Sequence, residues 1–265
     1  MNKFILHFLF LMTPIYLFAQ KGFHLGISGT FNSTWILDQN NIGTLRNFKD
    51  PAVRVSEMAY KNTWGGNAGL VLGYNFDNHW GIQTEIQYNF TGQLYRDSFM
   101  GPVTIPEGTF GKGSGRVDVQ RDIYLQYIQI PLFAKYISKG KVVKFFFALG
   151  PQIGFRTAAS EEVRIAGYVY LPDSLAFTAK QKFKAMDVGA ALQTGVEIYP
   201  LKFLYVNIGI STYYGFTDIN GKILKNPAWY QEKVYHASHN FRAGLMVGLH
   251  YIITKNKRAF SHSSK

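Results

Sequence analysis

The chain has 265 residues, of which 16% are aromatic, and it contains 26 glycines and no cysteine. The lack of cysteine excludes disulfides and zinc–thiolate sites. A mean hydropathy close to zero excludes a bundle of helical membrane spans, each of which needs about 20 consecutive apolar residues. The formal net charge is +12, but the cations are scattered over turns, loops and tail, which fits anionic lipid head groups better than nucleic acid.

The two ends of the chain differ from the rest. Residues 1–19 combine an early Lys3, an apolar run and a small residue, Ala19. This pattern predicts a secretory signal peptide rather than a span, because the run is short and polar sequence follows. Residues 254–265 are basic and polar, and we expect a short flexible tail in the periplasm. The predicted organisation is therefore a signal peptide at 1–19, a barrel domain at 20–253 and a tail at 254–265.

Eight segments carry an apolar side chain at every second position, which is the period of a pleated strand. In chain order they are residues 23–31, 67–76, 80–90, 127–136, 144–155, 187–198, 204–214 and 241–251. Short turns are expected near residues 77–79, 138–143 and 200–202, and they alternate with four long loops. An even number of strands with alternating short and long connections is typical of an outer-membrane barrel, whose short turns are periplasmic and whose long loops are external.

The connections between these strands carry further patterns. Long excursions are expected at 32–63, 93–121 and 156–184, and a last loop at 216–238. The third excursion contains two strand-like pieces, 163–170 and 176–183, which would extend strands beyond the bilayer. Pro131 and Pro151 lie inside strands and lack a donor for the ladder, so we expect a bulge or a break in pairing there, with a slip of one residue in the alternation.

The polar row of each strand indicates which way the apolar row faces. A lipocalin-like barrel in water would carry many Lys and Glu on its outer row. Here the polar row is mostly Gly, Asn, Gln and Ser, which suits the narrow interior of a small barrel. The predicted fold is therefore all-β: an eight-stranded antiparallel transmembrane β-barrel with its apolar row toward lipid. Nine aromatic residues are expected to form girdles at both membrane interfaces. They are Tyr74, Phe76, Trp80, Tyr88, Phe90, Tyr136, Phe155, Tyr214 and Tyr251.

Five charged residues fall in the inward row and form a predicted charge network in the lumen. They are Glu85, Lys135, Asp187, Glu197 and Arg242. Unpaired charges would be costly in a closed interior, so opposite signs should pair and plug the barrel. A proton or ion path through the same residues is the alternative.

No catalytic, cofactor or metal site is predicted. His236 and His239 have a spacing that metal ligands can adopt, but the only nearby carboxylate is Glu232, which favours an ordinary loop pair. Ser211 and His250 fall in the inward rows of neighbouring strands, as a nucleophile and its base would. They lie near opposite ends of those strands, so the pairing is expected to fail and an enzyme is not expected.

At the fourth and fifth strands the chain is similar to a known family. The run from Tyr127 to Tyr136, YIQIPLFAKY, and the run ALGPQIG at 148–154 resemble the PorT-type outer-membrane β-barrel proteins of Bacteroidetes. Asp-Val-Gly at 187–189, Gly-Val-Glu at 195–197 and the Phe-Ala-Gln that ends the signal are similar too. The resemblance implies an outer-membrane barrel of a Gram-negative bacterium, mostly of unknown function, and one branch of the family is linked to type IX secretion and gliding.

The predicted function is a non-enzymatic structural or interaction protein whose external loops meet a partner. A component of type IX secretion is one alternative, although the loops do not resemble those of that branch. A narrow-pore channel or a lipid-modifying barrel enzyme is another. The expected partners are outer-membrane lipids, a protein bound through the external loops and the barrel assembly machinery during insertion, without nucleic acid.

Overall fold

The computed structural model describes residues 22–38, 44–46, 54–57, 59–100, 103–105, 108–110, 116–165, 168–170, 179–222, 224–225 and 235–253. The predicted signal peptide and tail lie outside these residues. In the described part of the chain, no helix is long and apolar enough to cross a membrane.

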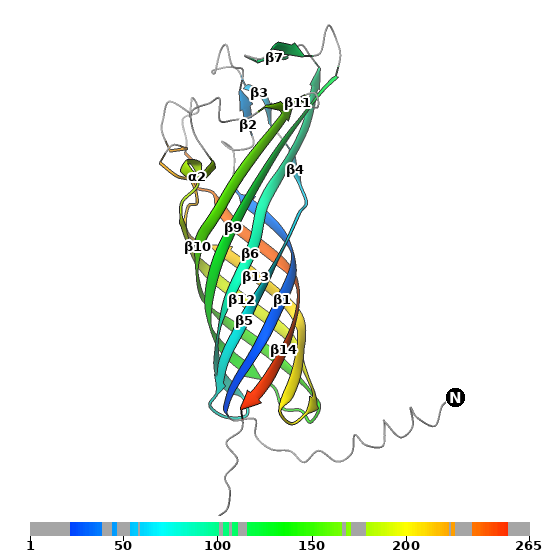
Figure 1. The fold of residues 1–265 in the computed structure, drawn as a ribbon, viewed down its shortest axis with the longest axis vertical. Helices are drawn as coiled ribbons and strands as arrows, with labels where there is room; N and C mark the ends of the chain where they lie inside the picture. Colours follow the sequence, from blue (N-terminus) through cyan, green and yellow to red (C-terminus); the bar gives the residue numbers. More distant parts are fainter. Residues whose placement is uncertain are drawn as a thin grey trace, which may run out of the picture.

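Eight long antiparallel strands form a closed ring, as predicted (Figure 1). They are β1 (Gly22–Leu37), β5 (Thr63–Asn75), β6 (Trp80–Met100), β9 (Arg116–Ile137), β10 (Val143–Ile165), β12 (Met186–Leu201), β13 (Leu204–Gly215) and β14 (His239–Ile253). Each strand pairs with the next, and β1 pairs with β14 from Phe23↔Ile253 to Leu37↔His239, which closes the ring. Because every ring strand has two neighbours, the barrel wall leaves no open sheet edge.

The three predicted short turns lie at the end of the ring that also carries Gly22 and Ile253 (Figure 1). They join β5 to β6, β9 to β10 and β12 to β13. In the first turn, the Asp77 carboxylate accepts hydrogen bonds from the N–H groups of His79 and Trp80 at 2.6 and 2.7 Å. This side-chain closure is why a turn of four residues suffices here.

Side chains alternate between the outside and the inside of the ring. Leu70 and Leu245 are 65% and 68% exposed, whereas Gln87 and Gln129 are each 2% exposed. The outer face is therefore apolar and the inner face polar, the reverse of a barrel that dissolves in water.

Three strands continue beyond the ring at the end opposite the termini (Figure 1). β6, β9 and β10 have 21, 22 and 23 residues, while the other ring strands have 12 to 16. Two short strands flank this extension, β4 (Ala59–Lys61) on β6 and β11 (Tyr168–Tyr170) on β10. Away from the ring sheet, β2 (Thr44–Arg46) pairs with β3 (Arg54–Glu57), and β7 (Val103–Ile105) pairs with β8 (Gly108–Phe110).

The in–out pattern of β9 inverts where it leaves the ring. Within the ring its outward row is apolar, as at Ile130, and its inward row is polar, as at Gln129. In the extension the outward row reads Asp118, Gln120, Asp122 and Tyr124, and the inward row reads Val117, Val119, Arg121, Ile123 and Leu125, with Arg121 paired to Glu161. The extension is thus built like a water-soluble sheet, polar outside and mostly apolar inside.

The inward apolar residues form a cluster that we call the apolar cap. Its buried members are Ile36, Tyr95, Val117, Val119, Ile123, Leu125, Tyr127, Val163, Phe183 and Ile219. Phe183 directly follows a short helix, α2 (Ala179–Lys182), which lies beside the middle of β10 (Figure 1). The cap covers the polar lumen at this end.

Several boundaries differ from the predictions. Residues 32–37, 93–100, 116–121 and 156–162 continue strands rather than forming loops. Residues 163–165 and 168–170 are extended, as predicted, whereas residues 179–182 are helical rather than extended. In residues 116–121 polar side chains face outward, so the apolar outward row that predicts a strand is absent there.

The prolines interrupt pairing without shifting it. Two pairs are missing from the β9–β10 ladder between Leu149↔Ala134 and Gln152↔Pro131, yet the register on both sides is the same. The predicted break is therefore present, but the predicted slip is wrong. The register shift lies higher, between Arg156 and Ala158.

The apolar cap should contribute to stability as a protein core does. Replacing Leu125, which is fully buried in the cap, with alanine is expected to lower the free energy of unfolding by about 2–5 kcal/mol, since the side chain leaves a cavity. Gln120 on the outward face of the same strand is the control, and its replacement by alanine should cost less than about 0.5 kcal/mol. Urea unfolding in detergent micelles would measure both; equal effects would contradict a packed cap.

Candidate functional site

The lumen of the ring is the most polar enclosed region of the molecule. Near the end that carries the termini, Lys135 and Glu197 form an ion pair with Nζ and Oε1 2.6 Å apart, and both side chains are at most 1% exposed. The Tyr199 hydroxyl donates to the other Glu197 oxygen. The Lys135 ammonium also lies 5.3 Å from the Tyr205 ring and 5.6 Å from the Phe146 ring, so aromatic faces complete its surroundings.

Glu85 lies one layer further along the lumen and is held by neutral donors. Its carboxylate accepts hydrogen bonds from Ser28 at 3.0 Å, Gln83 at 2.8 Å, Gln87 at 2.5 Å and Gln193 at 3.0 Å. Four donors can stabilise a buried carboxylate without a cation in contact.

Arg242 lies in the next layer and contacts three glutamines. Its guanidinium donates to Oε1 of Gln129, to Gln152 at 3.0 Å and to Gln87 at 3.5 Å. The guanidinium carbon lies 5.1 Å from the Tyr213 ring. No carboxylate among the described residues forms an ion pair with it.

Glutamines join these layers into one chain of contacts, which we call the lumen column. Lys135 donates to Gln83 at 3.1 Å, Gln83 donates to Glu85, and Gln87 lies between Glu85 and Arg242. Asp187 is apart from the column and accepts from Asn240 at 2.8 Å. All five predicted lumen residues are buried inside the ring, but direct pairing of opposite charges occurs only between Lys135 and Glu197. Glu85, Asp187 and Arg242 do not form the expected ion pairs, because Asn and Gln side chains hydrogen-bond to them instead.

A pair of histidines lies beside this column. Neither was among the predicted residues of the lumen charge network. His24 and His250 are 0% and 1% exposed, their ring centroids are 5.8 Å apart, and His250 stacks on Tyr205 at 4.4 Å. Their inward positions on β1 and β14 were visible in the alternation. Ser211 pairs with Gly244 and His250 with Tyr205, so six ladder positions separate this serine from this histidine.

Side chains fill the lumen near Arg242. A space of about 170 Å³ there is lined by Asn89, Thr91, Gln129, Tyr213, Asn240, Phe241 and Arg242. No part of this space is wide enough for a water molecule, so the side chains around Arg242 are closely packed.

The nine predicted girdle residues all lie on the outward face and form two bands. Tyr74, Phe76, Trp80, Tyr136 and Tyr251 surround the end that carries the termini, and Tyr88, Phe90, Phe155 and Tyr214 surround the other. Rings of neighbouring strands touch within a band, as Trp80 and Tyr136 do at 5.2 Å. Phe31 and Trp64, stacked at 5.1 Å and exposed on the outward face, extend the second band and were not among the predicted girdle residues.

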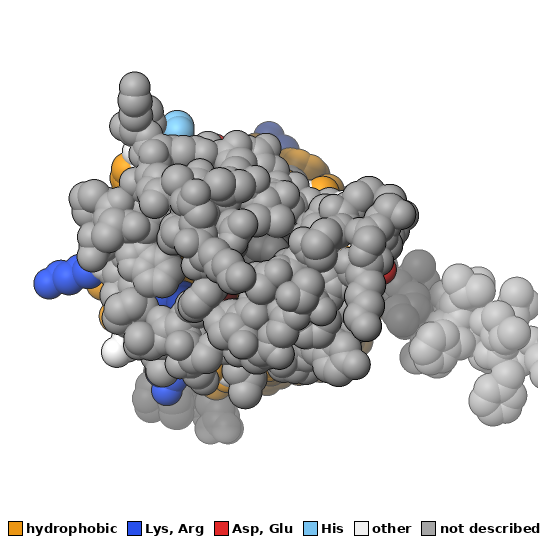
Figure 2. Space-filling model, turned by 90° about the horizontal axis from the view of Figure 1, so that it is seen from above, with side chains coloured by type: hydrophobic (Ala, Val, Ile, Leu, Met, Phe, Trp, Pro, Cys, Tyr) orange, Lys and Arg blue, Asp and Glu red, His pale blue; other side chains and the backbone are white. Residues whose placement is uncertain are grey.

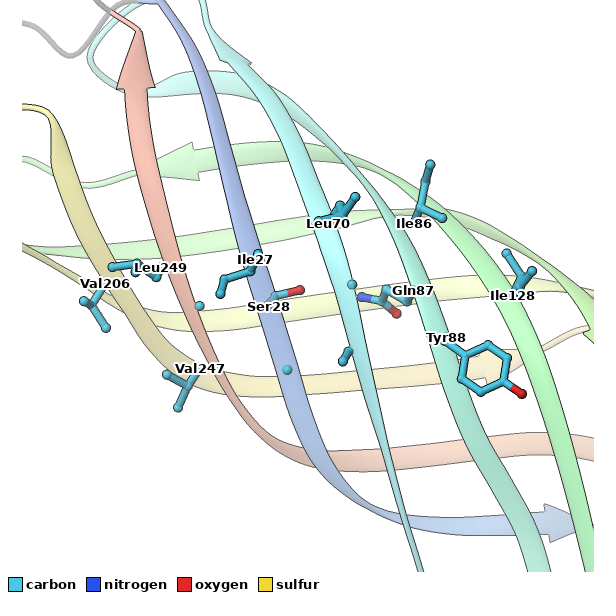
Figure 3. Close-up of a pocket in the computed structure, with 14 residues that line it drawn as sticks. Ile27, Ser28, Leu70, Ile86, Gln87, Tyr88, Ile128, Val206, Val247 and Leu249 are labelled. Carbon is cyan, nitrogen blue, oxygen red and sulfur yellow. The ribbon is translucent and has the colours of Figure 1, made fainter.

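Between the bands the wall carries one shallow apolar groove (Figure 3). The small residues Gly29 and Ala68 line it together with the larger Ile27, Leu70 and Ile86. Its exposed lining is almost wholly apolar, so it continues the apolar wall rather than presenting converging polar groups.

The predicted loop histidines do not meet. His236 is exposed, whereas His239 bonds through Nδ1 to the Gly215 carbonyl at 3.0 Å and stacks on Tyr214. Glu232 lies outside the described residues. Within the described ranges, no three His, Cys, Asp or Glu side chains are placed to hold a metal ion.

Asp218 organises the connection between β13 and β14. Its carboxylate accepts from the Asn220 and Ser238 N–H groups at 3.0 and 3.1 Å and from the Tyr235 hydroxyl, and it pairs with Lys225. Burial alone would raise the pKa of this carboxyl, but these donors outweigh it and hold the pKa below the ordinary 3.8.

The Asp218 contacts should therefore depend on pH. Because the folded pKa is lowered, their stabilisation is complete well above pH 3.8 and is lost as the pH falls through the lower folded pKa. Hydrogen-exchange protection at Asn220 and Ser238 is expected to be constant from pH 7 to 5 and to fall only at a pH below 3.8. Asp218→Asn should show weak protection at every pH, and protection in this variant equal to that of the wild type at pH 7 would contradict the role of Asp218.

Comparison with known proteins identifies the barrel. Residues 18–221 match the family described as outer membrane protein beta-barrel domain. The chain belongs to this family. Outer-membrane barrels place their short turns in the periplasm, so the ring end with Gly22 and Ile253 faces the periplasm and the extension of β6, β9 and β10 faces the outside of the cell.

Solved structures and curated sequences were also compared with this outer-membrane barrel. Neisserial surface protein A is 12% identical, with 89% of this chain and 100% of that chain covered and a TM-score of 0.44. Ail of Yersinia pestis, in complex with the heparin analogue sucrose octasulfate, is 13% identical (87% and 99% covered, TM-score 0.33). OprG of Pseudomonas aeruginosa is 12% identical (87% and 96% covered, TM-score 0.35). No curated protein sequence matches.

Proposed function

We propose that this outer-membrane barrel is a non-enzymatic interaction protein, which holds the β6–β9–β10 extension outside the cell for a protein partner. The observation that carries the proposal is the inversion of the in–out pattern along β9. An apolar core with a polar outer face is what a sheet needs in order to stay folded in water. The extension therefore offers a rigid polar surface, while the filled lumen supports a structural role for the barrel below it.

The partner surface can be tested by site-specific photo-crosslinking in intact cells. Tyr124 is 47% exposed on the outward face of the extension, and Leu70 is 65% exposed on the apolar wall. A photoreactive residue at position 124 is expected to give a discrete protein adduct, whereas one at position 70 should give lipid adducts. Lys139 in a periplasmic turn is a second control. No protein adduct at 124, or the same adduct at all three positions, would contradict the proposal.

If the lumen is closed, the barrel should not conduct ions. The purified barrel in planar bilayers is expected to add no conductance above the bare membrane, because the lumen column and the apolar cap leave no continuous water path. A porin reconstituted in the same way is the positive control. Reproducible single-channel steps would overturn the plugged barrel and favour the narrow-pore alternative.

The PorT-type assignment is a finer proposal that the runs at 127–136 and 148–154 support. If the chain serves type IX secretion, the adduct formed at position 124 should contain secretion components on mass spectrometry. An adduct at position 124 without such components would contradict the secretion role and leave the general interaction role in place.

Export through residues 1–19 and insertion by the barrel assembly machinery are part of the same proposal. The intact mass of the mature protein is expected to lack the first 19 or 20 residues. An unprocessed N-terminus would contradict the signal peptide.

A further inference from the structure

Eight of the described cations above the second aromatic band form two groups, and Lys61 and Lys222 belong to neither. In the first group each of five cations lies against a carboxylate: Arg96 on Asp122, Arg121 and Lys182 on Glu161, Arg164 on Glu162, and Lys225 on Asp218.

The second group consists of Arg156, Lys180 and Lys184, which we call the rim cluster. Arg156 donates from Nε to the Lys184 carbonyl at 3.0 Å and from Nη2 to the Lys180 and Phe183 carbonyls at 2.8 and 3.1 Å. These bonds hold both lysine backbones against one guanidinium. Lys180 is exposed, and Arg156 and Lys184 are partly exposed. Among the described residues none of the three forms an ion pair with a carboxylate, so the rim cluster carries positive charge that no described carboxylate neutralises.

The rim cluster lies directly above the apolar wall. Arg156 follows Phe155, a member of the second aromatic band, and Lys184 comes two residues before Met186. Phe155 and Met186 are paired in the β10–β12 ladder and are 46% and 47% exposed on the outward face. Figure 2, which looks down on this end, shows Lys and Arg side chains projecting at the edge of the molecule, including the side on which α2 lies in Figure 1.

We propose that the rim cluster is a docking surface for the phosphate groups of a phosphorylated lipid in the outer leaflet, whose acyl chains lie against Phe155 and Met186. Charge complementarity selects an anion, and continuity with the apolar wall selects one that is attached to acyl chains. A guanidinium suits phosphate because it offers several N–H donors in one plane. Three cations at the depth of lipid head groups attract an anionic membrane surface.

The proposal can be tested with the whole mature protein in nanodiscs. The probe is lipid A doped into a neutral phospholipid at increasing fractions, compared with dephosphorylated lipid A that has the same acyl chains. Native mass spectrometry of the released protein measures the bound lipid. The wild type is expected to retain phosphorylated lipid A selectively, and Lys180→Gln/Lys184→Gln should bind it roughly 20-fold more weakly. This variant keeps Arg156 and its carbonyl bonds, so the local fold is retained.

Lys139→Gln/Lys141→Gln is the matched control, because it removes the same charge from a periplasmic turn and should bind as the wild type does. Equal binding of both lipid forms by the wild type, or unchanged binding by Lys180→Gln/Lys184→Gln, would overturn the proposal. Equal loss in the two variants would show an effect of net charge alone and would also overturn it. Displacement of the lipid by millimolar inorganic phosphate would assign the site to a free anion instead.

Discussion

Replacing Lys135 with methionine is expected to lower the free energy of unfolding by about 3–5 kcal/mol. Its ammonium is 2.6 Å from Glu197, and both side chains are buried at the periplasmic end of the lumen. Methionine has nearly the same length and can fill the space between the Phe146 and Tyr205 rings. The loss therefore reports the Glu197 carboxylate left without its cation rather than a cavity. Urea unfolding in lipid vesicles, followed by tryptophan fluorescence, would measure it.

Two further variants test whether the loss of stability comes from the Lys135–Glu197 ion pair. Adding Glu197→Gln to Lys135→Met should recover most of the lost stability, because no buried charge then remains unpaired. Lys144→Met on β10 is the control, since that lysine is partly exposed above the Tyr199 ring, and it should cost less than about 1 kcal/mol. If the double variant were less stable than Lys135→Met, the ion pair would not be the source of the effect.

Replacing Arg242 with methionine is expected to cost about 3 kcal/mol. The change leaves the side-chain oxygens of Gln87, Gln129 and Gln152 without their common donor in a closed interior. The loss should be smaller than for Lys135, because the groups left without a donor are neutral amide oxygens rather than a buried carboxylate. The same unfolding assay would measure it.

Arg164→Met provides the comparison for Arg242. Arg164 pairs with Glu162 on the extension, where both side chains are about two-fifths exposed, so its loss should change stability by less than about 1 kcal/mol. If Arg242→Met were as stable as the wild type, the glutamines would not depend on the guanidinium, and the lumen column would not be a structural unit.

Much of the barrel followed from alternation alone. An eight-strand count, the short turns and the outward row of residues such as Leu70 and Trp80 all come from a period of two combined with loop lengths. The upper parts of β6, β9 and β10 did not, because residues such as Val119 and Asp122 exchange faces relative to the pattern below them. Where a strand passes from lipid into water, its side chains still alternate with a period of two. The outward side chains, however, change from apolar to polar.

The lumen shows a different limit. The alternation of side chains along each strand placed Glu85, Lys135 and Arg242 inside the ring. Which residues they contact, however, depends on distances across the ring, and the alternation does not give these. Arg242 on β14 reaches Gln129 on β9 and Gln152 on β10, which lie across the ring from it. Glutamines in the inward row were visible in the sequence and are long enough to cross a narrow interior. Their number was the available signal that amides, rather than opposite charges, would satisfy most of these groups.

The continuity of β9 from lipid into water has a mechanical consequence. Its ladder with β6 runs from Trp80↔Tyr136 in the wall to Met100↔Arg116 at the outer end. A pull on the outer end acts along the strand direction, so the hydrogen bonds on both sides of β9 carry the load together in shear instead of opening one after another. Force applied to the extension by a bound partner would thus be passed to the membrane wall, and the barrel would serve as its anchor.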